Sequence, residues 1–158
     1  MNITILAVGK IKEKYFTDAL REYSKRMSRF AKFNIIEVPD EKIPDNPSEK
    51  EITAVKEKEG ALILSRLPKN AYTAAMCVEG DLISSEELAE KISAATMSAS
   101  HIAFIIGGSL GLSDEVKRRA DIRISFGRIT LPHQLMRVVL AEQIYRAFKI
   151  NANESYHK

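Results

Sequence analysis

Short apolar runs rich in β-branched residues alternate with segments of helical periodicity along the whole chain. The runs have the usual length of buried strands. The expected strands are residues 2–8, 33–38, 71–78, 102–106 and 122–126, and the expected helices are residues 13–32, 48–66, 84–98, 114–120 and 132–149. This alternation predicts an α/β fold, with a mostly parallel sheet and helices on both faces.

Serine residues mark the starts of three of these helices. Ser48 precedes Glu51 by three residues, and Ser84 precedes Glu87 by the same spacing. This pattern is a capping box, in which each side chain satisfies an unpaired backbone N–H group of the first turn. Ser113 is the expected cap of the short helix over 114–120, whose two acidic residues in the first turn favour the helix dipole.

Length and residue types narrow the class of protein. No repeat or low-complexity linker divides the 158 residues, so residues 1–158 are expected to form a single domain. The one cysteine, Cys77, excludes an internal disulfide, and with three scattered histidines it gives no basis for a metal site. We expect Cys77 to be a buried small hydrophobe. His101 should lie at the surface.

No part of the sequence predicts a membrane segment. The apolar run over 3–8 is too short for a secretory leader and lacks a basic start, and no stretch approaches the roughly 20 apolar residues of a membrane span. We therefore expect a cytoplasmic protein without a membrane or metal partner.

Charge is unevenly distributed along the chain. Residues 1–100 hold 15 Lys and Arg against 16 Asp and Glu, whereas residues 101–158 hold 9 against 5, which gives −1 and +4 and the total of +3. A mild positive bias in the last third suits an anionic partner. The total is small for tight binding to free RNA, since phosphate contacts supply most of that affinity.

The last helix has two narrow polar stripes and is otherwise apolar. At about 100° per residue, His133 and Arg137 share one face, while Glu142, Arg146 and Lys149 share nearly the opposite one. A helix that is apolar on both remaining sides must be covered on more than one of them. We expect the sheet to cover one side and a second copy of the chain to cover another, which predicts a homodimer.

Two glycine-bearing loops follow the fourth and fifth expected strands, over 107–111 and 126–131. Loops at the ends of strands are where α/β sheets usually hold ligands. The common nucleotide-binding and hydrolase motifs are absent, including G-x-G-x-x-G, the P-loop, G-x-S-x-G and H-E-x-x-H. The ligand site is therefore expected late in the chain.

Motifs throughout the chain resemble the RlmH-type methyltransferases of the SPOUT superfamily. They are AVGK at 7–10, FIIGGSLG at 104–111, TLPHQ at 130–134, RV at 137–138, EQIYRA at 142–147 and YHK at 156–158. The resemblance runs from the first strand to the last residue, and the chain length fits. Its C-terminal motifs are specific to the family.

This resemblance implies both a fold and an activity. The fold is a SPOUT-like α/β domain with a C-terminal trefoil knot, in which the last helix passes through a loop of the preceding segment. The activity is that of an S-adenosylmethionine-dependent homodimer that methylates N3 of a pseudouridine in large-subunit (23S) rRNA on the assembled ribosome. By matching motif positions, the methyl donor should contact Met76, Gly108, Phe126, Gly127, Arg128, Ile129, Thr130 and Leu131.

Five further residues are candidates for the chemistry. His133 could bind RNA, orient a group or cap its helix, and Arg137 could meet a phosphate or a carboxylate partner. Either Arg137 or Arg146 could stabilise negative charge on the ring oxygens, and Arg146 could instead pair with the glutamate one turn before it. Tyr156 and His157 are the candidates for removing the N3 proton.

The tail itself is ambiguous from its residues. The stretch over 151–158 is polar and rich in asparagine, which is typical of a disordered end. An aromatic ring, an imidazole and the cation Lys158 could instead stack on a base, exchange a proton and meet a phosphate. The resemblance favours the functional interpretation.

Two other functions remain open at this point. A SPOUT enzyme could act on tRNA or on a ribose 2′-hydroxyl, which methylation assays on ribosomes and on tRNA would separate. The chain could also be a non-catalytic regulator that binds the cofactor, in which case it would bind the donor but transfer no methyl group to any ribosomal preparation.

Overall fold

The computed structural model describes residues 1–157 and contains one five-stranded sheet. The strands lie in the order β2-β1-β4-β3-β5, and every neighbouring pair is parallel. The strands are β1 (Asn2–Val8), β2 (Lys32–Val38), β3 (Tyr72–Leu82), β4 (His101–Ile106) and β5 (Ile122–Ser125), and the helices are α1 (Lys14–Met27), α2 (Glu49–Arg66), α3 (Ser85–Thr96), α4 (Asp114–Arg119) and α5 (His133–Asn151). The expected α/β class is confirmed.

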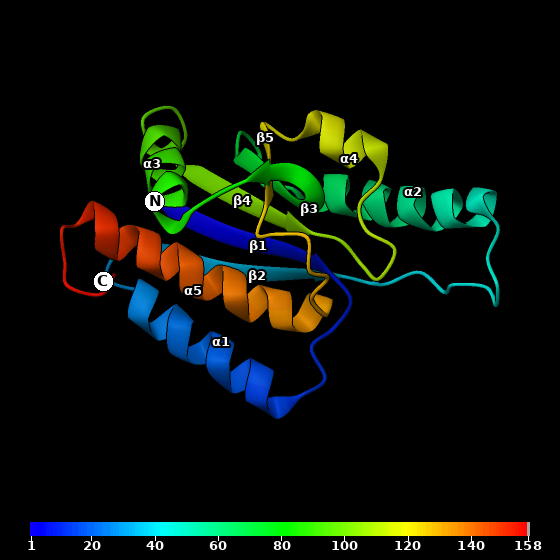
Figure 1. The fold of residues 1–158 in the computed structure, drawn as a ribbon, viewed down its shortest axis with the longest axis horizontal. Coiled ribbons are helices and arrows are strands. Elements are labelled where there is room, and N and C mark those ends of the chain that lie inside the picture. Colours follow the sequence, from blue (N-terminus) through cyan, green and yellow to red (C-terminus); the bar gives the residue numbers. More distant parts are fainter. Residues whose placement is uncertain (158) are drawn as a thin grey trace.

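Helices cover both faces of this sheet (Figure 1). Helices α1, α3 and α5 lie on one face, and α2 and α4 lie on the other. Alternate residues of each strand point to opposite faces, so Phe104 packs under α5 while Ile105 packs toward α2. Both residues are 1% exposed. The central strands are therefore buried on both sides, as their continuous apolar sequences indicate.

All three expected serine caps are present. Ser48 and Ser84 each accept a hydrogen bond from the backbone N–H group three residues on, and the glutamates at those positions complete the capping boxes. Ser113 accepts from the N–H group of Val116 at 3.3 Å. These starts agree with the sequence because a cap depends on residues only three positions apart.

Two boundaries differ from the sequence-based prediction. Helix α1 ends at Met27 rather than near residue 32, because a turn follows in which the N–H group of Phe30 donates to Met27 O at 2.8 Å. Strand β3 continues to Leu82 through a register shift between Met76 and Asp81. Gly80 permits this bulge, since a Cβ there would lie 2.8 Å from the Ile124 backbone.

Helix α5 lies on the sheet between α1 and α3 (Figure 1). These two helices supply much of the cover that the sequence led us to assign to a second subunit. Several apolar residues of α5 nevertheless stay partly exposed in a single chain, namely Leu135, Met136, Val138, Val139 and Phe148. The homodimer and the threading of α5 through a knot both stay predictions. Within residues 1–157, no helix is long and apolar enough to cross a membrane.

Candidate methyl-donor pocket and C-terminal cluster

A cavity of about 590 Å³ opens where β3, β4 and β5 reach their carboxyl ends. Its volume is in the range of sites that hold a nucleoside-sized ligand. The walls come from the end of β3, the β4–α4 loop, the β5–α5 loop and the first turn of α5. The lining residues are Met76, Cys77, Val78, Glu79, Ile106, Gly107, Gly108, Ser109, Leu110, Gly111, Leu112, Lys117, Ile124, Ser125, Phe126, Gly127, Ile129, Thr130, Leu131, His133 and Met136. Both glycine-bearing loops therefore meet at one site.

Most of the residues expected to contact the methyl donor lie around this cavity. Seven of the eight line it, and Arg128 is the exception. Arg128 is exposed on the same loop. His133, which was expected among the reacting groups, also lines the cavity. Motif positions that lie 50 residues apart in sequence, such as Met76 and Phe126, are thus brought into one wall.

Backbone conformation shapes the two loops. Gly127 has φ +127°, a region that residues with a side chain rarely adopt, and its N–H group donates to Ser125 Oγ at 3.2 Å. Gly107 lies so close to the returning chain that a Cβ would be 2.7 Å from the carbonyl carbon of Gly111. The first loop closes with a hydrogen bond from Gly111 N to Gly108 O at 3.0 Å. Glycine is therefore needed at Gly107 for the tight turn of the first loop and at Gly127 for the backbone conformation of the second.

His133 stands where the cavity meets the end of β1. Its ring packs against Gly9, at 3.4 Å from the position that a Cβ of Gly9 would occupy. Burial lowers the pKa of His133, and the nearby Arg137 guanidinium lowers that pKa further. The imidazole is therefore neutral near pH 7. Its Nδ1 is buried without a hydrogen-bond partner within the described residues.

Arg137 is fully buried, at 0% exposure. Its guanidinium donates to Glu37 Oε2 at 2.6 Å, to Gly9 O at 2.7 Å and to Val8 O at 3.2 Å. Glu37 also accepts from the N–H group of Ile11 at 2.9 Å. Of the contacts considered from sequence, the structure shows the carboxylate partner. In this arrangement Arg137 holds the end of β1 and does not reach a substrate phosphate or ring oxygen.

Tyr156 packs back onto the outer half of α5. Its ring lies 5.0 Å from the ring of Tyr145, centroid to centroid, and the Arg146 guanidinium lies 4.8 Å above it. The phenol donates to Glu142 Oε1 at 3.1 Å, and the same oxygen accepts from Arg146 Nη2 at 2.7 Å. The glutamate pairing that was considered for Arg146 is thus present. The tail is docked over these residues, not free.

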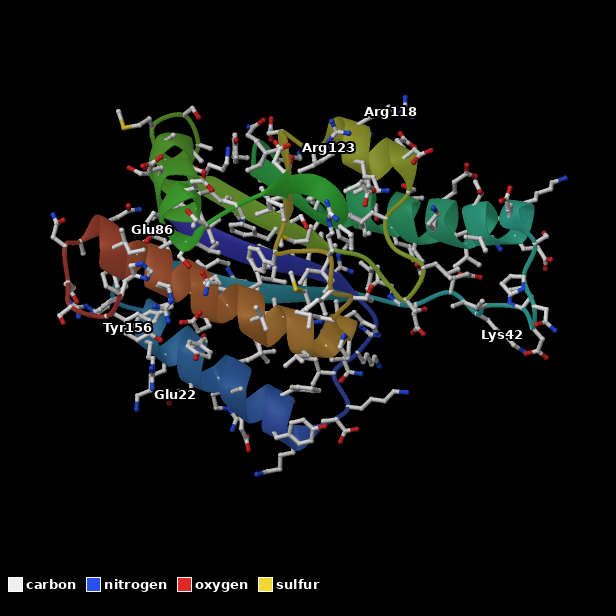
Figure 2. All side chains as sticks on the ribbon, viewed as in Figure 1. Glu22, Lys42, Glu86, Arg118, Arg123 and Tyr156 are labelled. Carbon is white, nitrogen blue, oxygen red and sulfur yellow. The ribbon has the colours of Figure 1, made fainter. Side chains whose placement is uncertain are left out.

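His157 joins the same cluster. One ring nitrogen lies 3.2 Å from Arg146 Nη1, and the other lies 2.6 Å from Glu86 Oε1 at the start of α3. Figure 2 labels Tyr156 and Glu86 at the end of the molecule where α5 finishes. Lys158, the expected phosphate contact, lies outside the described residues. We call Glu142, Arg146, Tyr156 and His157 the C-terminal cluster.

The cavity and the C-terminal cluster lie toward opposite ends of α5. His133 and Arg146 are thirteen residues apart on this helix, which at 1.5 Å per residue is about 20 Å. A single chain therefore does not bring the expected proton-removing residues to the expected methyl donor.

Some lining residues were not expected from sequence. Cys77 is half-buried in the cavity wall, not fully buried, and burial raises the pKa of its thiol. Lys117 and Glu79 form an ion pair at the rim. Glu79 lies beyond the end of the third strand as predicted from sequence, whereas β3 continues through the bulge to Leu82. No cluster of three metal-binding side chains occurs among residues 1–157.

Sequence comparisons place this chain among known methyltransferases. A family model described as "Predicted SPOUT methyltransferase" matches residues 1–157. A protein of Clostridium novyi (strain NT) named "Ribosomal RNA large subunit methyltransferase H" is 57% identical over the full length of both chains. A protein of the same name from Listeria monocytogenes is 55% identical, again over the full length of both.

Solved structures support the fold. A probable methylase family protein from Haemophilus influenzae superposes on 99% of this chain and 70% of its own, with a TM-score of 0.58 and 17% identity. The tRNA (m1G37) methyltransferase from Aquifex aeolicus superposes on 92% of this chain and 70% of its own, with a TM-score of 0.52 and 14% identity. At these identities the likeness concerns the fold alone.

Proposed function

This chain belongs to the SPOUT methyltransferase family, and we propose that it transfers a methyl group from S-adenosylmethionine to N3 of a pseudouridine in large-subunit (23S) rRNA. The observation that carries this proposal is the 55–57% identity, over the full length of both chains, to relatives named "Ribosomal RNA large subunit methyltransferase H". We further propose that it forms one domain with a trefoil knot, works as a cytoplasmic homodimer and takes its rRNA within the assembled ribosome.

The residues around the cavity fit the proposed donor. Cavity volume and the open space beside Gly127, where a Cβ would meet nothing within 4 Å, suit a nucleoside. Apolar side chains such as Met76, Leu131 and Met136 can pack on its rings and methylene groups. S-adenosylmethionine supplies an electrophilic methyl group on a sulfonium centre. The protein positions that methyl group in line with the acceptor nitrogen and removes entropy from the barrier.

Attack by N3 requires loss of the proton that this nitrogen carries in the neutral base. Burial and the hydrogen bond to Glu142 raise the pKa of Tyr156, so its phenol stays protonated near pH 7. Tyr156 is thus a poor base and serves better as a hydrogen-bond donor or stacking surface. His157 is then the remaining tail candidate for removing the proton, and it would have to exchange its contact with Arg146 for the base, because Nδ1 accepts from Arg146 and Nε2 lies beside Glu86. Arg146, released from that contact, could stabilise negative charge on the ring oxygens.

Dimerisation through α5 would bring the start of this helix in one chain close to its end in the other chain. Leu135, Val139, Glu142 and Arg146 recur at helical spacing on one partly exposed stripe. If two copies pack antiparallel about a twofold axis near Val139, residue 133 of one chain faces residue 146 of the other, since the two are nearly equidistant from position 139. The C-terminal cluster of each chain would then complete the cavity of its partner.

Hybrid dimers test this shared site. One subunit lacks residues 154–158, and the other carries Thr130→Arg, which places a bulky cation in the cavity from an exposed loop position. Each variant alone should be inactive. Equal coexpression should restore roughly a quarter of wild-type activity, because half of the dimers are hybrids with one intact site of two. Methyl incorporation per ribosome is the measurement, and a mixture as inactive as its components would show that the tail acts on its own subunit.

Substrate choice decides between the proposed function and its alternatives. Purified protein with labelled donor should methylate ribosomes that lack the modification and leave tRNA unlabelled. Transfer to tRNA, or to a ribose hydroxyl, would contradict the proposed substrate. Donor binding without transfer to any ribosomal preparation would favour a regulator.

A further inference from the structure

Glu59 is a buried carboxyl group in the middle of α2. The residue is 4% exposed, although a glutamate at the surface of a helix is normally solvated. Its Oε2 accepts a hydrogen bond from the N–H group of Glu41 at 3.0 Å, whereas Oε1 is buried and has no partner within the described residues. The next residue, Gly60, lets α2 pack closely against the start of α4, because a Cβ there would lie only 2.5 Å from Ser113 Oγ.

The carboxyl group of Glu59 lies directly behind the cavity loop. A Cβ on Gly108 would be 3.1 Å from Oε1 and 3.2 Å from Oε2. Gly108 itself lines the cavity. One residue without a side chain therefore separates this carboxyl group from the space that a ligand would fill.

No cation compensates Glu59 in the described part of the chain. Burial raises the pKa of Glu59, and the neighbouring carboxylates Asp40 and Glu41 raise that pKa further. The nearby Lys58 is paired with Glu41 instead. A buried carboxyl group without a positive partner is costly for a fold, and a cation in the adjacent cavity would offset that cost.

We propose that Glu59 is a specificity-determining residue, whose charge acts across Gly108 and makes the cavity prefer a cationic ligand to its neutral counterpart. This inference rests on the proposed function. S-adenosylmethionine carries one positive charge more than S-adenosylhomocysteine, the product left after methyl transfer. The same carboxyl group thus favours binding of the donor and release of the product.

Calorimetry with the full-length protein tests this preference. Glu59→Gln keeps the size of the side chain and an oxygen for the Glu41 N–H group but removes the charge. We expect about a tenfold loss of affinity for S-adenosylmethionine, the size of effect that a charge at several ångströms has in a partly shielded site. The affinity for S-adenosylhomocysteine should change less than twofold. An analogue with a protonated amine in place of the sulfonium should behave like the donor.

Glu57→Gln is the matched control, since it makes the same change at an exposed position of the same helix. It should leave both affinities unchanged. Equal weakening of donor and product by Glu59→Gln would overturn the inference, because it would mean that Glu59 only holds the loop. If the wild-type protein binds neither ligand, the proposed function fails before this comparison is reached.

Discussion

Removal of residues 154–158 is expected to abolish methyl transfer while leaving the donor affinity near that of the full chain. The deleted segment contains Tyr156 and His157 of the C-terminal cluster, and none of its residues 154–157, which the structure describes, lines the cavity. The truncated chain loses the group that removes the N3 proton and the side chains that position the target base. These losses should lower the rate at least about 1000-fold. Transfer of labelled methyl groups to ribosomes measures the rate, and calorimetry measures the affinity.

The truncation should lower stability only modestly. Tyr145 loses its contact with the Tyr156 ring, which is worth about 1 kcal/mol. Arg29 and Lys149 lose their ion pairs with Glu154. Urea unfolding of the truncated protein separates this small effect from the catalytic one. The assignment of the tail fails if the truncated protein methylates ribosomes at the full rate.

Replacing Arg137 should cost stability far more than replacing any other cation of α5. Arg137→Met leaves Gly9 O and Val8 O without their buried donor and removes the partner of Glu37. Glu37 is 37% exposed and can be solvated, so the main cost comes from the buried carbonyl groups, and a buried acceptor left without its donor typically costs about 1–3 kcal/mol. The free energy of unfolding in urea is the measurement. Donor affinity should fall as well, because Gly9 supports His133 at the cavity.

Arg146→Met is the comparison within the same helix. Arg146 also pairs with a glutamate, but its hydrogen bonds go to side chains and not to buried carbonyl groups, and an i,i+4 pair on a helix typically contributes about 0.5 kcal/mol. We expect a small loss of stability and a large loss of methyl transfer for Arg146→Met. Unchanged unfolding of Arg137→Met, or equal destabilisation by the two substitutions, would contradict the roles assigned to these arginines.

Local patterns predicted the fold well, and tertiary features limited the prediction. The starts of α2, α3 and α4 followed from serines that act on residues three positions away. Strand β3 was predicted too short, because its bulge depends on the backbone of Ile124, which packs against Gly80 from a distant strand. Such pairing is invisible in a window of neighbouring residues.

The candidate site was predictable in its loops but not in the partners of its charged residues. Glycine-bearing loops at the ends of two strands predicted a ligand site at 107–111 and 126–131, and in the structure both loops line one cavity. Helical spacing put Arg137 on a polar stripe, yet that stripe faces Glu37 and the end of β1. The charge of a side chain does not reveal whether its partner is solvent, substrate or a strand far away in sequence.

Mass spectrometry of large-subunit rRNA tests the central proposal most directly. In a strain that lacks the gene for this chain, one pseudouridine-containing fragment of 23S rRNA should lose the mass of a single methyl group. Expression of the intact chain should restore that mass, and expression of the chain without residues 154–158 should not. An unchanged 23S rRNA in the deletion strain, or a methyl group lost from tRNA instead, would contradict the proposed function.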